Sequence, residues 1–122
     1  MVASITLWRV EDRRLEELQM IHHIVLYKLK PEVTVEELEQ ILIQTRMQLL
    51  KISVATNLRC GRGMDPKNEW RFFVAVDFDS KDRLAMFKED PIYIKFIEET
   101  IKPNTREQLV LDYETDPKRK HS

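Results

Sequence analysis

Four short apolar segments recur along this chain. Stretches with helical spacing follow the first and the third segment, whereas a short loop joins the second to the third. The apolar segments cover residues 22–29, 54–62, 70–79 and 107–114 and carry apolar residues at alternate or at nearly all positions. Segments of this length and pattern predict β-strands. Because successive side chains of a strand point to opposite faces, each predicted strand can be divided into two sets of residues.

Both faces of the first strand are substantially apolar, which is typical of a strand inside a sheet covered on both sides. One face carries His23, Val25, Tyr27 and Leu29, and the other carries His22, Ile24, Leu26 and Lys28. In the second strand one face is predicted to hold Val54, Thr56, Leu58 and Cys60. The third strand alternates between an apolar face and a mixed face that includes Phe73, Asp77 and Arg71.

Between the first two strands, the sequence has the start signal and the spacing of an amphipathic helix. Thr34 and Glu37 can form a capping box, in which each side chain bonds the backbone N–H of the other residue. The helix is expected to run to about residue 51. Its predicted buried stripe consists of Leu38, Ile41, Leu42, Thr45 and Leu49.

The helical region between the third and fourth strands is predicted to be split in two. Ser80 is a good N-cap for a short first helix. Asp90 and Pro91 then supply the cap and the first residue of another helix. The buried positions expected in this region are Leu84, Phe87, Ile97 and Ile101, with either Tyr93 or Ile94.

The resulting order of elements is β-α-β-β-α-β. It predicts an α+β fold of the ferredoxin-like kind, in which helices cover one face of a four-stranded antiparallel sheet. The domain is expected to occupy residues 20–115, with residues 1–19 as an N-terminal extension and residues 116–122 as a basic C-terminal tail. Met20 is a candidate second translation start, which would make residues 1–19 an appended extension. In the other interpretation, residues 1–19 pack against an edge of the domain.

A sheet with two apolar faces and helices for only one of them needs a second cover. If ~800 Å² of the other face is apolar, its burial contributes on the order of 20 kcal/mol, against an association cost of ~4–15 kcal/mol. A two-fold homodimer that packs sheet face against sheet face is therefore expected. The aspartates and Arg71 of the mixed face would then pair across or around its centre.

Composition and charge exclude several classes of partner. With 20 Lys and Arg against 21 Asp and Glu, the formal net charge is −1, whereas a nucleic-acid-binding protein usually has a concentrated basic surface. No apolar run reaches the ~20 residues of a membrane span, and no secretory signal is evident. We therefore expect a cytoplasmic protein with no nucleic-acid or membrane partner. Because Cys60 is the single cysteine, the sequence has no CxxC motif and no cysteine–histidine cluster with the spacing of a zinc site. No cofactor is expected.

Two adjacent histidines are the most chemically suggestive residues of the sequence. His22 and His23 point to opposite faces of their strand, so they cannot bind one metal ion together. With an ordinary pKa near ~6.5, His23 is suited to acid–base work near neutrality, and Tyr27 or Tyr93 could hydrogen-bond a substrate carbonyl. The favoured alternative is a buried histidine satisfied by a backbone carbonyl or a tyrosine hydroxyl. Similarly, Asp77 and Asp112 are expected to be solvated or salt-bridged, in preference to forming a carboxylate pair or holding a cation such as magnesium.

Four segments in this order resemble the stress-responsive A/B barrel (Dabb) family. They are residues 23–30 (HIVLYKLK), Phe78-Asp79-Ser80, Asp90-Pro91-Ile92-Tyr93 and residues 109–113 (LVLDY), and the resemblance spans about residues 20–114. It implies a dimeric α+β barrel, in agreement with the burial argument. It also implies either a stress-response protein without a known reaction or a small enzyme.

One type of protein in this family, the polyketide cyclases, holds a small aromatic precursor between sheet and helices. In that type a histidine that matches His23 works with a second histidine, and Tyr93 stands at the second position here. Phe87 stands where that type has a pocket tyrosine. These departures argue against the same cyclase mechanism, and cofactor-free monooxygenases share the fold as well.

Two function hypotheses follow. The first is a stress-associated homodimer without assured catalytic activity. The second is a cofactor-free enzyme or binder, polyketide-cyclase-like or monooxygenase-like, that takes an aromatic or polyketide-type small molecule. Its candidate catalytic residues are His23, Tyr93 and Tyr27, and its candidate pocket residues are Phe87, Val25 and Leu29. A cavity of ~300 Å³ or more with His23 in its wall favours the second hypothesis, and a filled core around His23 favours the first.

Overall fold

The computed structural model describes residues 20–115, so the predicted extension 1–19 and tail 116–122 lie outside the described residues. The strands are β1 (Ile21–Leu29), β2 (Thr56–Arg62), β3 (Phe72–Phe78) and β4 (Thr105–Glu114). The helices are α2 (Val35–Leu49), α3 (Lys81–Glu89), α4 (Pro91–Phe96) and α5 (Lys102–Asn104), with a π-helical turn, η1 (Ile97–Ile101), between the last two. The predicted order β-α-β-β-α-β, with its second helical region divided, is confirmed.

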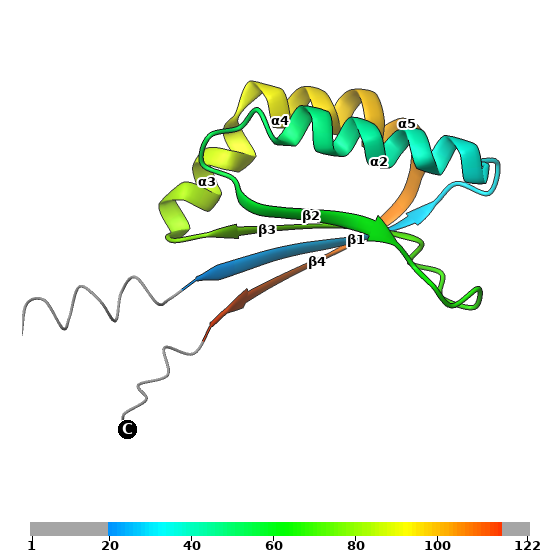
Figure 1. Ribbon diagram of the computed structural model, residues 1–122, viewed down its shortest axis with the longest axis horizontal. Helices are drawn as coiled ribbons and strands as arrows, with labels where there is room; N and C mark the ends of the chain where they lie inside the picture. Colours follow the sequence, from blue (N-terminus) through cyan, green and yellow to red (C-terminus); the bar gives the residue numbers. More distant parts are fainter. Residues whose placement is uncertain (1–19, 116–122) are drawn as a thin grey trace, which may run out of the picture.

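The strands form one antiparallel sheet in the order β2-β3-β1-β4, and the helices of residues 20–115 all lie on one face of it (Figure 1). This is the ferredoxin-like arrangement that the element order predicts. It places β1 between β3 and β4 and leaves β4 at an edge of the sheet. None of the helices within residues 20–115 is long and apolar enough to cross a bilayer.

The hydrophobic core lies between the sheet and the helices. On β1 it includes His23, Val25 and Tyr27, each at most 3% exposed, which confirms the predicted division of that strand into two faces. The apolar face of β3 and the predicted stripe of α2 complete this layer. Its buried members are Phe72, Val74, Val76, Phe78, Leu38, Ile41, Leu42, Thr45 and Leu49.

Capping side chains fix where the helices begin. The Thr34 hydroxyl accepts the backbone N–H of Glu37 at 3.1 Å, and the Glu37 carboxylate accepts that of Thr34 at 2.8 Å, so the capping box is present. Ser80 caps α3 and Asp90 caps α4, as expected. Because Ser80 follows β3 so closely, α3 starts next to the end of the sheet where β1 begins and β4 ends (Figure 1).

The prediction that Thr56 and Cys60 share one face of β2 is wrong. Thr56 pairs with Asp77, whereas Cys60 pairs with Val74, and these two residues of β3 lie on opposite faces. The register shifts between Thr56 and Arg59, where Asn57 has a φ of +49°. A bulge of this kind inserts residues into one strand and reverses its alternation, and an asparagine tolerates the left-handed conformation.

The choice between Tyr93 and Ile94 is settled in favour of Tyr93. Ile94 is 50% exposed, whereas Tyr93 packs against the core. Phe96, three residues after Tyr93 and on the same helix face, is 2% exposed and joins the core without having been predicted.

The other face of the sheet has no helix over it among residues 20–115 (Figure 1). We call it the open face. Its central positions are apolar and oppose one another across the strands: Ile24 with Ala75 and Leu111, and Leu26 with Phe73 and Leu109. The prediction of two apolar faces is therefore confirmed.

Charged groups at both ends of the open face are paired within the chain. At one end Asp77, which is 6% exposed, accepts hydrogen bonds from His22 at 2.8 Å and Arg59 at 2.6 Å. At the other end Lys28 lies 3.2 Å from Glu107 and 3.4 Å from Glu69, and the hydrogen bond to Glu107 raises the pKa of Lys28. The Asp77 charge thus has partners in its own chain.

Candidate functional site

His23 and Asp112 form a hydrogen-bonded pair on the helix-covered face of the sheet. They are direct partners in the antiparallel pairing of β1 with β4, so their side chains point to the same face. His23 Nδ1 lies 2.5 Å from Asp112 Oδ1. Because an ionised carboxylate can only accept, the imidazole donates through its Nδ1–H, and in the neutral ring Nε2 is then the proton acceptor.

The two members of this pair differ in their access to solvent. His23 is 3% exposed, whereas the side chain of Asp112 is 40% exposed because β4 is an edge strand. Asp112 is therefore the group that a small molecule can reach, and His23 holds the carboxylate from the side of the core.

Phe87 connects His23 with Tyr93. The ring centroids of His23 and Phe87 are 6.4 Å apart in an edge-on arrangement, and those of Phe87 and Tyr93 are 4.5 Å apart. Phe78 also packs against Phe87, with ring centroids 5.1 Å apart. Three residues of the predicted site, His23, Phe87 and Tyr93, therefore lie together in an aromatic cluster that fills the core.

Tyr27 lies deeper, stacked on Phe72 with ring centroids 5.3 Å apart. Burial, and to a smaller extent the neighbouring Tyr93, raises the pKa of Tyr27 well above its usual range. Burial also raises the pKa of Tyr93. Both phenols thus stay neutral near pH 7 and can only act as hydrogen-bonding groups, because a depressed pKa would be needed for a phenolate base.

The structure does not bring the remaining predicted pocket residues to one place. Val25 is buried between the positions of His23 and Tyr27 on β1. Leu29 ends the strand, six residues from His23 and therefore about 20 Å away along β1. The predicted residues thus form a row along the strand, in which His23 meets Phe87 and Tyr27 neighbours Tyr93.

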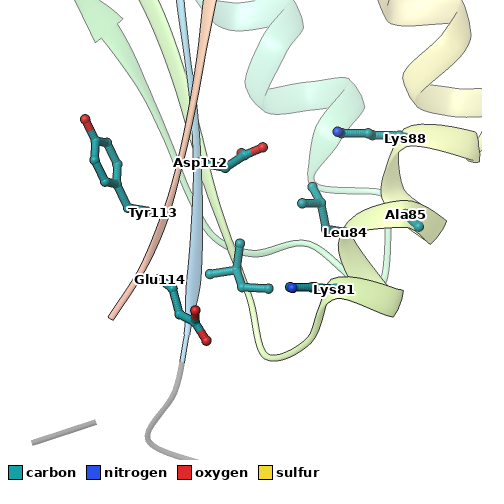
Figure 2. A pocket seen from close by; sticks show the side chains of 8 residues that line it. Lys81, Leu84, Ala85, Lys88, Asp112, Tyr113 and Glu114 are labelled. Atoms are coloured by element: carbon teal, nitrogen blue, oxygen red, sulfur yellow. The ribbon is translucent and has the colours of Figure 1, made fainter. Parts of the chain in front are cut away.

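A cavity of about 460 Å³ opens between α3 and the paired ends of β1 and β4 (Figure 2). Its volume lies in the range of ~300–1,000 Å³ that is usual for small-molecule pockets. Asp112 lies in its wall, whereas His23 lies behind Asp112 and is not among the lining residues, so this is not the predicted cavity with His23 in its wall. The lining residues are Ile21, Lys81, Leu84, Ala85, Lys88, Asp112, Tyr113 and Glu114.

The cavity has an apolar centre and charged margins. Ile21, Leu84 and Ala85 supply the apolar part. The Tyr113 side chain points away from it towards the open face (Figure 2). A molecule in this cavity would therefore bury an apolar body and meet charged groups at its ends.

The sequence interpretation missed Asp112 as the partner of His23, and it missed the cavity. A signal for the pair exists, because alternation already places Asp112 on one face of the last strand with Gln108 and Val110. The register that sets Asp112 opposite His23 depends on long-range pairing, and alternation within one strand does not contain it. The position of α3 against the sheet edge has no local signal.

A second histidine–aspartate pair lies on the open face and is separate from the first. His22 Nδ1 lies 2.8 Å from Asp77 Oδ1, and Asn57 and Arg59 also donate to Asp77. Since Asp77 and Asp112 occupy opposite faces of the sheet, they do not form a carboxylate pair. Across residues 20–115, no group of three or more His, Cys, Asp or Glu side chains is placed to hold a metal ion.

Cys60 is a packing residue of β2. Its thiol lies 3.9 Å from the carbonyl oxygen of Leu42, and burial raises its pKa, an effect that nearby Arg46 partly opposes. A raised pKa lowers the thiolate fraction at neutral pH, so the environment of Cys60 is unlike that of a catalytic cysteine.

Several solved structures share this fold. A Dabb-family protein from Mesorhizobium loti has a TM-score of 0.69 and 23% identity, covering 78% of this chain and 95% of its own. A dimeric protein of unknown function from Bacteroides fragilis has a TM-score of 0.68 and 26% identity, covering 79% and 96%. Hydroxynitrile lyase from Passiflora edulis has a TM-score of 0.68 and 19% identity, covering 80% and 94%.

The comparison with curated protein sequences finds no match. The family model of the stress-responsive A/B barrel domain, in contrast, matches residues 21–115, which is nearly the whole described chain. The sheet order, the single helical layer and the apolar open face agree with this match. The chain therefore belongs to the stress-responsive A/B barrel (Dabb) family.

Proposed function

We propose that this protein is a homodimer that binds a small, largely apolar molecule in the cavity beside α3, with Asp112 and His23 as its acid–base group. The observation that carries the proposal is the position of Asp112, which lines the cavity and is held by the buried His23 at 2.5 Å. A carboxylate whose orientation is fixed in this way can accept a hydrogen bond, or a proton, from a bound molecule.

The proposed roles of the two residues follow from their exposure. Asp112 contacts the ligand. His23 is a positioning residue, because its Nδ1–H donates to Asp112 Oδ1 and stabilises the negative charge of the carboxylate. The raised pKa of Tyr93 keeps its phenol neutral, so it is not a proton acceptor. Its proposed role is to pack against Phe87, which in turn packs against His23. The hydroxynitrile lyase among the neighbours indicates that this fold accommodates an enzyme, while the reaction in this chain depends on its own side chains.

The homodimer is supported by the composition of the open face. Its centre is apolar, with Ile24, Leu26 and Phe73 partly shielded and Leu109 40% exposed, while the charges at its ends are neutralised within the chain. A second copy can therefore cover the centre without burying an unpaired charge, which would be costly. The Bacteroides fragilis neighbour is described as dimeric.

A thermal-shift screen with aromatic acids and ketones tests the binding proposal. A ligand at 100 times its dissociation constant stabilises the folded protein by ~2.7 kcal/mol, which corresponds to a rise of roughly 4–8 °C in Tm for a domain of this size. We expect at least one compound to stabilise the wild type, and its effect to fall in Asp112→Asn and in His23→Ala. If no compound stabilises the wild type selectively, the stable homodimer alone remains as the function.

A further inference from the structure

One face of α3 forms the outer wall of the cavity. Its four lining residues, Lys81, Leu84, Ala85 and Lys88, are spaced three, four and seven residues apart, which places them on one side of a helix. The two apolar residues lie in the middle and a lysine stands at each end. At a rise of 1.5 Å per residue, the strip between the lysines is about 10 Å long.

Each lysine faces a carboxylate of β4 across the cavity. Lys88 extends towards Asp112, and Lys81 lies at the level of Glu114 (Figure 2). Neither lysine forms an ion pair with any residue from 20 to 115, since neither comes within 4.0 Å of a carboxylate. Both ammonium groups thus remain available to a molecule that occupies the space between helix and strand.

The two ends of the cavity differ in how their carboxylates are used. Oδ1 of Asp112 already accepts the Nδ1–H of His23, so one of its two oxygens is engaged from the side of the core. Glu114 has no ion-pair partner among the described residues and can balance Lys81. Lys88 therefore faces a carboxylate with one oxygen already engaged, and it stands at the acid–base end of the cavity.

We propose that the cavity recognises an apolar monocarboxylate, with its carboxylate on Lys88 and its hydrocarbon body along Leu84, Ala85 and Ile21. This inference rests on the proposed binding function and specifies its ligand class. An ammonium of lysine is a suitable partner for a carboxylate, and the apolar strip offers a surface for the hydrocarbon. Lys88 then lies between the ligand carboxylate and Asp112 and offsets the repulsion between the two anions.

Isothermal titration calorimetry with three eight-carbon probes tests the assignment. Octanoate, octanol and octylamine carry the same chain with a negative, a neutral and a positive head. The proteins are the wild type, Lys88→Met, Lys81→Met and a control, Lys51→Met, which changes an exposed lysine outside the cavity. Methionine keeps much of the side-chain volume and removes the charge.

We expect octanoate to bind the wild type more tightly than the other two probes. Lys88→Met should weaken octanoate by about tenfold, the loss expected for one charge-assisted hydrogen bond, and should change octanol by less than about twofold. Lys81→Met should have a smaller effect and Lys51→Met none.

Tighter binding of octylamine or octanol, or an unchanged octanoate affinity in Lys88→Met, would overturn the carboxylate assignment. If neutral compounds still stabilise the protein through Asp112, the proposed binding function stands without it. Failure of all three probes, together with an empty thermal-shift screen, would reject both.

Discussion

Asp112 on the edge strand β4 accepts a hydrogen bond from His23 on the central strand β1, with 2.5 Å between Oδ1 and Nδ1. The pair joins two environments, since His23 packs edge-on against Phe87 in the core and Asp112 lines the cavity beside α3. It therefore links a residue whose position is fixed by packing to one that a ligand can touch.

The first prediction concerns the stability that this pair contributes. Asp112→Ala leaves Nδ1 of the buried His23 without its acceptor, which should lower the free energy of unfolding by about 1–2 kcal/mol. The loss stays at the low end because Asp112 is 40% exposed and water can replace part of the bond. Asp112→Asn retains an acceptor oxygen and should cost less. Urea denaturation of the three proteins measures the difference, and equal stabilities would contradict the role of the pair.

The open face predicts a dimer that one charge can disrupt. Leu109 opposes Leu26 on this face and is 40% exposed, so Leu109→Glu should be tolerated by the monomer fold and should separate the two copies. The matched control is Met47→Glu on α2, which alters a residue that is 54% exposed on the helical side. Sedimentation velocity should show a dimer for the wild type and the control, and a monomer for Leu109→Glu. A monomeric wild type at micromolar concentration would contradict the assembly.

Gly61 provides a test of packing on the same face. A Cβ atom at this position would lie 2.9 Å from Cε1 of Phe73, so Gly61→Ala must displace the phenyl ring. We expect a loss of about 1–2 kcal/mol in the free energy of unfolding, as for other overpacked sites. In a Phe73→Leu background the same substitution should cost much less, and a double-mutant cycle measures the coupling. Equal costs in both backgrounds would show that the ring does not limit this position.

The buried tyrosines predict that stability falls in alkaline solution. Tyr27 and Tyr93 have raised pKa values in the folded protein, whereas in the unfolded chain tyrosines ionise near pH ~10. Above that pH the unfolded state releases protons that the folded state retains, so the free energy of unfolding decreases as pH rises. Urea denaturation from about pH 8 to about pH 11 should show this slope. The double variant Tyr27→Phe, Tyr93→Phe should reduce this dependence of the unfolding free energy on pH. An unchanged slope in the double variant would show that other groups cause it.

Much of the fold could be predicted because it is encoded locally. The alternation of β1 separates His23 from Ile24, and the capping signals at Thr34 and Ser80 give the helix starts. The bulge at Asn57 could not be predicted, because an asparagine with positive φ has no strong sequence signal and one inserted residue reverses a strand.

The candidate site was predicted only in part, for a related reason. His23 and Phe87 were identified as site residues and do lie together. The contributions of Asp112 and Lys88 depend on how β4 pairs with β1 and on where α3 lies against the sheet edge. These are long-range relationships, and periodicity within one element carries no information about them.

The central claim, that the cavity and the His23–Asp112 pair form one site, is tested most directly by the imidazole nitrogen resonances of His23. The experiment uses ¹⁵N-histidine-labelled protein and titrates a compound that stabilises the wild type. The account predicts that the His23 signals shift to saturation with the binding curve, through Asp112, and that Ala85→Trp, which fills the cavity, abolishes the shift. Saturating binding that leaves the His23 resonances unchanged, or that survives Ala85→Trp, would contradict it.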